Sequence, residues 1–264
     1  MLVKLLKYDL KWLLKIVCVF LIIGIVFSVL GRLLEFCPNS LFFNIIKGIV
    51  KGIGLSLTIS ALFNSVIRPW VRLTNNMYND ESYLSNTLPV SRSKHYLSKC
   101  LSGLICVVLS VTVLLLNVFI MYYSKSNIQL LKDSLNLVAT TLDVSIIGFI
   151  LLVFLVILFE VLFILQCGYF GIILGHTYNK IKLLKTFIFG FGSYMVCSTV
   201  SLILIVIMSL FNEGLASVVL GGSTVIEFGL LKFLMIYVCV VYVIYIAVLY
   251  YINNKILSKG INIE

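Results

Sequence analysis

Six long apolar runs alternate with shorter polar segments along the chain. The runs cover about residues 16–34, 45–67, 100–123, 144–169, 184–210 and 228–252. An α-helix rises about 1.5 Å per residue, so a helix of about twenty residues crosses the roughly 30 Å hydrocarbon core of a membrane. The pattern therefore predicts an all-α integral membrane protein whose six transmembrane helices form a single domain over residues 1–264.

The first fifteen residues have a pattern of their own. Lysines recur on one helical face at positions 4, 7, 11 and 15, leucines occupy much of the remainder, and Trp12 suits the headgroup level. These features predict an amphipathic helix over residues 1–15 that lies in the membrane interface. A signal peptide is disfavoured because no small-x-small cleavage site follows and further apolar runs do.

The longest polar interruption covers residues 77–99, between the second and third apolar runs. Asn79 or Asp80 can cap a short helix, and Pro89 ends it because the residue before a proline disfavours helical backbone. Ser91 can then cap the helix that leads into the third run. We expect a short helix, a proline break and an immediate return to the membrane.

The sequence of this interruption resembles a loop of a known family. It is similar to the loop after the second span in bacterial type-2 ABC exporter permeases, over Tyr83-Leu84-Ser85-Asn86-Thr87-Leu88-Pro89-Val90-Ser91-Arg92-Ser93-Lys94 and then Leu97-Ser98-Lys99. Relatives often carry an acidic residue and a glycine before the Tyr-Leu pair, where this chain has Glu81-Ser82. Two other segments are also similar to that family: Leu5-Leu6-Lys7-Tyr8-Asp9-Leu10-Lys11, and Gly175-His176 with Lys180 and Lys182.

The resemblance implies a function and a set of partners. The chain would be a pore-forming permease subunit that pairs with a second permease subunit, as a homodimer or a heterodimer, and with separate ATP-binding subunits. ATP and Mg would bind to those partners, and this chain would hold no cofactor. The substrate would be amphipathic: a peptide, a lipid-like molecule or a drug. The short helix would be a cytoplasmic coupling helix, with the partner-binding residues Asp80, Glu81, Tyr83, Leu84, Leu88 and Pro89.

Composition and charge agree with a membrane location. The chain is 61% hydrophobic and 11% charged, whereas soluble domains usually carry about 25% charged residues. Its net charge is +10, but the positive residues flank the spans, which favours membrane topology and anionic lipid over nucleic acid. Fourteen Lys and Arg residues fall in the predicted inner segments and six in the outer ones. Both termini of this multi-pass membrane protein are therefore predicted to be cytoplasmic, and the resemblance implies a bacterial plasma membrane.

Motifs for catalysis are absent from the sequence. It contains no G-x-x-x-x-G-K-[ST] phosphate-binding loop, no H-E-x-x-H and no G-x-S-x-G. Its seven cysteines include no C-x-x-C pair, which gives no indication of a metal site or a disulfide framework. We expect a protein that is not an enzyme, although a membrane-embedded enzyme with an unrecognised motif stays open as an alternative.

Glu160 is the exceptional residue of the spans, near the middle of the fourth run. A carboxylate at that depth costs about 2.5 kcal/mol or more on insertion, so it is expected to face the bundle or a wet cavity. Asn117 and Gln166 are possible polar neighbours. Glu160 is a candidate for the substrate path, for a proton site in a proton-coupled secondary transporter, or for a packed neutral side chain.

Four weaker patterns add further expectations. Gly48 and Gly52 have the small-xxx-small spacing of close helix packing, with no packing role as the alternative. His176 is either a contact for a cytoplasmic partner or an interfacial histidine. An outer segment, 211–227, can dip into the membrane and return. Apolar residues at helical spacing predict a short amphipathic helix on the outer face, through Ile128, Leu131, Leu135, Val138 and Leu142.

Overall fold

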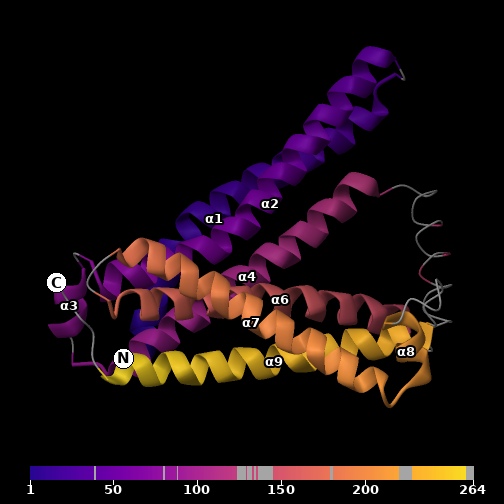
Figure 1. Cartoon of the computed structure of the whole chain (residues 1–264). Helices are drawn as coiled ribbons and strands as arrows, with labels where there is room; N and C mark the ends of the chain where they lie inside the picture. The colour runs from indigo at the N-terminus through magenta and orange to yellow at the C-terminus, as the bar shows by residue number, and fades with distance from the viewer. Residues whose placement is uncertain are drawn as a thin grey trace. The chain divides into compact units, whose positions relative to one another are not determined.

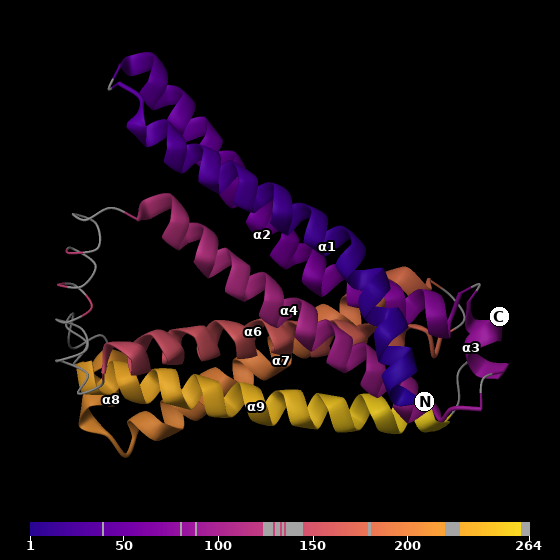
Figure 2. The ribbon, with the colours of Figure 1, turned by 180° about the vertical axis from the view of Figure 1, so that it is seen from behind.

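The computed structural model is almost entirely helical in the part of the chain that it describes (Figures 1 and 2). The described residues are 1–38, 40–79, 81–87, 89–123, 129, 133, 135, 145–178, 181–219 and 228–259. Six long helices are α1 (Leu2–Leu33), α2 (Leu41–Met77), α4 (Arg92–Tyr122), α6 (Ile146–Gly175), α7 (Lys182–Ser209) and α9 (Phe228–Lys259). Three short ones are η1 (Leu34–Phe36), α3 (Ser82–Thr87) and α8 (Glu213–Val219).

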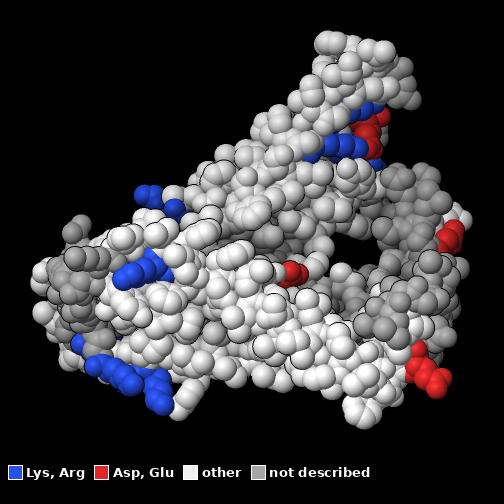
Figure 3. Space-filling view, viewed as in Figure 1, with Lys and Arg blue, Asp and Glu red and all other residues white. Residues whose placement is uncertain are grey.

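The six predicted spans are confirmed as helices that are long and apolar enough to cross a membrane. Charged side chains are sparse on the face that Figure 3 displays, where large areas are covered by uncharged residues. The helices extend beyond the apolar runs: α2 continues to Met77, α4 starts at Arg92 and α6 reaches Gly175. Residues 1–15 form the first half of α1, so the structure has no separate helix there.

The chain divides into two compact units, which are described one at a time. Unit 1 comprises Met1–Ile128 together with Leu257–Glu264, and unit 2 comprises Gln129–Ile256. Unit 1 thus contains α1 to α4, and unit 2 contains α6, α7, α8 and most of α9.

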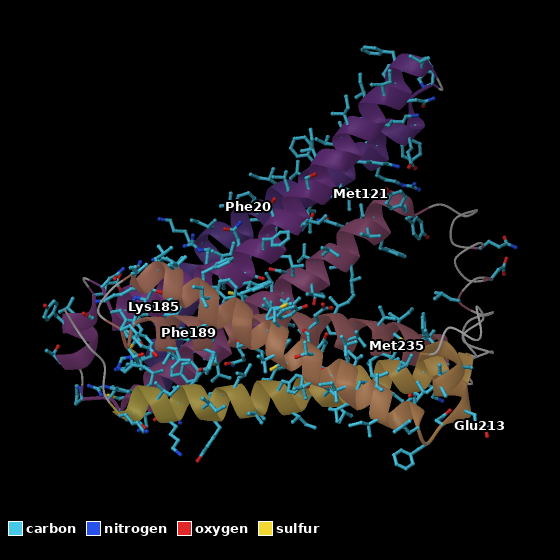
Figure 4. The ribbon with its side chains drawn as sticks, viewed as in Figure 1. Phe20, Met121, Lys185, Phe189, Glu213 and Met235 are labelled. Carbon is cyan, nitrogen blue, oxygen red and sulfur yellow. The ribbon has the colours of Figure 1, made fainter. Side chains whose placement is uncertain are left out.

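Unit 1 is a bundle of α1, α2 and α4 that packs through small side chains. The buried face of α1 repeats every three or four residues, which is the helical period, and its members are Asp9, Leu13, Val17, Leu21, Gly24, Ser28 and Gly31. A Cβ atom added to Gly54 of α2 would lie 2.5 Å from Met121 Cε of α4 (Met121 is labelled in Figure 4) and 3.2 Å from the Ser28 nitrogen. Glycine therefore permits the close approach of the helices at this level.

Hydrogen bonds between small polar residues reinforce the same bundle. The buried Asn117 of α4 donates from Nδ2 to Thr58 Oγ1 of α2 at 2.7 Å, and Thr58 donates to the Gly54 carbonyl at 2.7 Å. Such bonds satisfy side chains that the hydrocarbon would otherwise leave without partners. The Asn117 amide is thus part of the packing of unit 1.

Unit 2 begins with a tight hairpin of α6 and α7 built on glycines. A Cβ atom added to Gly171 would lie 2.6 Å from the Gly190 nitrogen, and one added to Gly175 would lie 2.7 Å from Thr186 Cα. By contrast, Gly48 and Gly52 of α2 have open space around the position of a Cβ atom. The small-xxx-small spacing at Gly48 and Gly52 therefore has no packing role within the described chain, and the close-packed pair lies at Gly171 and Gly175 instead.

Aromatic side chains join α9 to this hairpin. Phe163 of α6 is buried, and its ring lies 5.6 Å from Tyr194 of α7 and 5.3 Å from Tyr242 of α9, measured between ring centroids. Tyr245 of α9 lies 5.6 Å from the same ring. Phe163 thus links all three helices through ring contacts.

Two sequence expectations fall mainly outside the described residues. Most of the predicted outer amphipathic helix, from Ile128 to Leu142, lies outside the described residues. Within the segment 211–227, the structure describes α8 with a buried Leu215, and residues 220–227 lie outside the described part. Re-entry of this segment into the membrane stays a prediction.

Candidate functional site

The predicted short helix corresponds to α3, a six-residue helix between α2 and α4 at the end of unit 1 where α1 begins (Figures 1 and 2). Tyr83 and Leu84 are its exposed apolar residues, at 67% and 74% of full exposure, and Pro89 beyond it is also exposed. Asp80 and Leu88, the other two residues of the predicted set besides Glu81, lie outside the described residues.

The cap predicted at Ser91 is only partly present in the structure. Ser91 precedes α4 with extended backbone, as an N-cap residue does, but its side chain makes no capping hydrogen bond. Within α3, Ser82 is fully buried.

Glu81 connects the start of this segment to α2. Its carboxylate Oε2 accepts a hydrogen bond from Arg72 Nη1 at 2.8 Å. The same guanidinium donates from Nε to Asp9 Oδ1 of α1 at 3.1 Å. Arg72 thus bridges an exposed acid beside α3 and a buried acid in α1.

Asp9 is the centre of a buried polar cluster formed by three helices. Its side chain is ion-paired with Lys99 of α4, and Ser98 donates to Asp9 Oδ2 at 2.7 Å. Asp9 and Lys99 are each only 2% exposed. Because a buried charge without a partner is costly, the pair and its hydrogen bonds hold α1, α2 and α4 in one arrangement.

Trp12 packs beside this cluster, one turn further along α1. Its ring lies 4.2 Å from Arg68 Cζ and 5.3 Å from Arg72 Cζ, distances typical of cation–π contacts. Arg68 also donates from Nη2 to the Trp12 carbonyl at 3.2 Å. Arg68 and Arg72, which the sequence places beside a span, are therefore bound within the bundle.

The sequence reasoning did not single out the Asp9 cluster. One signal was available: Asp9 is the only acidic residue before Glu35, and it precedes Leu13, Val17 and Leu21 at intervals of four residues. That spacing places an acid on the apolar stripe of a helix, where it must find a partner. The identity of the partners, Arg72 and Lys99, requires the tertiary structure.

A second charged cluster lies at the other end of unit 1. Glu35 is ion-paired with Arg32 and accepts from Lys51 Nζ at 2.6 Å. Lys51 lies 5.4 Å from the Tyr122 ring centroid, and Arg32 lies 5.8 Å from that of Tyr123. Figure 3 shows basic and acidic groups gathered over the far part of α1 and α2.

The two clusters are separated by about the thickness of a membrane. Asp9 and Arg32 are 23 residues apart in α1, and Arg72 and Lys51 are 21 apart in α2. At about 1.5 Å per residue these separations are about 35 Å and about 32 Å, close to the roughly 30 Å hydrocarbon core. The clusters therefore fit the two interfaces of the bilayer, with apolar helix between them.

Glu160 lies half-buried near the middle of α6 in unit 2. Within the described residues, no hydrogen bond or ion pair reaches its carboxylate. The Tyr242 ring of α9 lies 5.3 Å, between ring centroids, from that of Phe163, which follows Glu160 by three residues in α6. Of the neighbours suggested by sequence, Asn117 donates to Thr58 in unit 1, and Gln166 accepts from Asn253 at 3.5 Å through its backbone carbonyl.

A pocket of about 240 Å³ lies within unit 2, and its lining includes Phe163, which follows Glu160 by three residues in α6. Its lining residues come from α6, α7 and α9 and are Phe163, Ser198, Ser201, Leu202, Tyr242 and Tyr245. The Ser201 and Tyr245 hydroxyls share a hydrogen bond of 3.0 Å, and Tyr237 donates to the Ser201 carbonyl at 3.0 Å. The wall of the pocket thus combines aromatic faces with hydroxyl groups.

His176 follows α6 and serves the end of that helix. Its Nδ1 lies 2.8 Å from the Ile172 carbonyl, so this nitrogen carries the proton and donates. The pKa of His176 is lower than its usual value. Burial is the main cause and Lys182 adds to it, while the bond to Ile172 opposes the shift. His176 is therefore a neutral residue at pH 7 that binds the last turn of α6, and its contact with a cytoplasmic partner stays a prediction.

Comparison with protein-family models, with curated proteins and with solved structures finds no match to this chain.

Proposed function

We propose that this chain is the permease subunit of an ATP-driven exporter in a bacterial plasma membrane. It pairs with a second permease subunit and with separate ATP-binding subunits, which bind ATP and Mg and carry out hydrolysis. The substrate is amphipathic and leaves the cell by alternating access of the helices. The proposal extends the resemblance of residues 83–94 to the loop of type-2 ABC exporter permeases.

One observation carries the proposal: α3 exposes Tyr83 and Leu84 while the adjoining Glu81 is bound to Arg72. Two neighbouring apolar groups on a short polar segment suit a groove on a protein partner, and tyrosine suits an interface that is partly wet. Tyr83 and Leu84 thus belong to a segment that an ion pair joins to α2.

The linked ion pairs of Glu81, Arg72, Asp9 and Lys99 suggest how a movement of α3 reaches the long helices of unit 1. A partner that displaces α3 moves Glu81 and with it Arg72, which also binds the buried Asp9. Asp9 is paired with Lys99, so α1, α2 and α4 respond together. The proposed role of ATP-driven closure is to shift this three-helix unit between two packed arrangements.

The test is copurification and export by an interface variant. Tyr83→Ala combined with Leu84→Ala removes the exposed anchors, and truncating an anchor often costs about 2 kcal/mol or more in binding. We expect the tagged variant to reach the membrane in wild-type amount, to lose the copurifying ATPase and to lose ATP-dependent export.

The matched control is Phe36→Ala combined with Leu41→Ala, which removes two exposed apolar side chains at the opposite end of unit 1. It should retain the ATPase. The proposal is wrong if the α3 variant copurifies an ATPase at the wild-type ratio and exports at the wild-type rate.

A second candidate is a proton-coupled secondary transporter, because Glu160 lacks a hydrogen-bonding partner among the described residues and lies in a span. Glu160→Gln preserves size and removes titration. If the protein is a proton-coupled transporter, this variant loses transport driven by a proton gradient. Depletion of ATP at a constant gradient then leaves transport by the wild-type protein unchanged. In an ATP-driven exporter, ATP depletion stops transport while the gradient persists.

A further inference from the structure

We propose that the pocket of unit 2 binds an organic cation, with Glu160 as the counter-charge and the rings of Phe163, Tyr242 and Tyr245 as the surrounding wall. The assignment of this cation as the exported substrate rests on the proposed function. The binding site itself rests only on the geometry of α6, α7 and α9.

The first step is that Glu160 and the aromatic residues lie at similar heights along two parallel helices. Glu160 lies fourteen residues after the start of α6 at Ile146, and Tyr242 lies fourteen residues after the start of α9 at Phe228. Phe163 and Tyr245 each lie three residues further on, and their rings are in contact. The two helices run side by side in the same direction (Figures 1 and 2), so the acid and the aromatic groups occupy adjacent levels.

The second step is the charge of the site. The described part of unit 2 supplies no ion pair to Glu160. An ionised carboxylate at that depth is costly without a partner, and a bound cation supplies one. Aromatic faces attract cations as well, most strongly where water is excluded. Carboxylate and rings together therefore favour a cation over a neutral or anionic ligand.

The third step is size and polarity. The pocket, at about 240 Å³, is smaller than the roughly 300–1,000 Å³ of sites for drug-sized ligands. It accommodates a cationic head with a few attached carbon atoms. Leu202 and the Phe163 ring provide apolar contact, while the Ser201 and Tyr245 hydroxyls can bind a polar group of the ligand.

The test uses benzyltrimethylammonium, which combines a quaternary ammonium with one aromatic ring. Equilibrium binding of the radiolabelled compound is measured on the purified full chain in a neutral maltoside detergent. We expect saturable binding that Glu160→Gln weakens at least tenfold and that Glu160→Asp largely retains. Tyr242→Leu should weaken it by a similar factor.

Two controls separate the effect of charge from that of hydrophobicity. Glu213→Gln changes an exposed acid of α8 (labelled in Figure 4) and should leave the affinity within twofold of wild type. Neopentylbenzene has the same shape as the probe without its charge and should not compete. Choline lipids carry the same quaternary ammonium, so competition by phosphatidylcholine would identify a lipid headgroup as the natural source of the cation.

The proposal is overturned if the wild-type chain does not bind the probe, if Glu160→Gln binds it as well as wild type, or if neopentylbenzene competes equally. The measurement needs no ATP-binding subunit. Its failure therefore leaves the exporter assignment standing, and a failed ATPase copurification leaves the cation site standing.

Discussion

At the scale of single residues, Asp9 organises unit 1. It is bonded to Arg72 of α2 and to Ser98 and Lys99 of α4. Removing one partner of a buried ion pair strongly destabilises the fold, because the other charge then stays buried without compensation. The cluster at the opposite end is more exposed, with Glu35 at 32% of full side-chain exposure, and solvent weakens such pairs.

This contrast gives the first prediction. Asp9→Asn should lower the free energy of unfolding by about 3–5 kcal/mol, because Lys99 then stays buried without its counter-charge. Glu35→Gln should lower it by about 1 kcal/mol or less. Adding Lys99→Met to Asp9→Asn should restore part of the loss. Unfolding by sodium dodecyl sulfate in mixed micelles measures all four proteins, and equal losses for Asp9→Asn and Glu35→Gln would contradict the account.

The site residues were only partly predictable from sequence. The apolar pair Tyr83 and Leu84 could be located because proline and capping residues mark a short helix around them. The burial of Ser82 and the pairing of Asp9 with residues 72 and 99 could not, because both depend on contacts across more than one helix. Periodicity shows which face of a helix is inward and does not show what lies opposite.

At the scale of elements, the number and type of the long helices followed from apolar runs. Their ends did not, because polar residues such as Arg72 and Lys99 continue the helices once neighbouring helices provide partners. Glycine patterns were ambiguous for a related reason. Gly48 and Gly52 have the same spacing as Gly171 and Gly175, yet only the second pair faces a close neighbour.

The second prediction tests that difference. Gly171→Ala should destabilise unit 2 by about 1–3 kcal/mol, because its methyl group would overlap the Gly190 backbone and force α6 and α7 apart. Gly192→Ala, in the same hairpin but with open space around it, should be neutral or stabilising by up to about 1 kcal/mol. Detergent unfolding compares the two variants; a harmless Gly171→Ala would mean that the helices are further apart than described.

At the scale of the whole molecule, six helices fit a multi-pass membrane protein. The excess of Lys and Arg in alternate segments predicts that both termini are cytoplasmic. In unit 1 the two charged clusters agree with helices that cross the bilayer once each, since their spacing matches the hydrocarbon core.

The third prediction concerns this topology. Tags at Met1 and Glu264 should be protected from protease in intact cells, and a tag near Asn127 should be cleaved. Permeabilised cells provide the control, in which all three tags become accessible. A C-terminal tag that is cleaved in intact cells would contradict the orientation and would move α3 to the wrong side of the membrane for an ATP-binding partner.

The most direct measurement places a photo-crosslinking amino acid at position 84 in α3 and, separately, at position 36 in η1. Membranes are irradiated, and partners are identified by labelling with a photoreactive ATP analogue. We predict that the chain crosslinked from position 84 is joined to an ATP-labelled subunit and that the chain crosslinked from position 36 is not. Absence of an ATP-labelled adduct at position 84, or equal adducts at both positions, would contradict the proposal that α3 docks to the subunit that powers export.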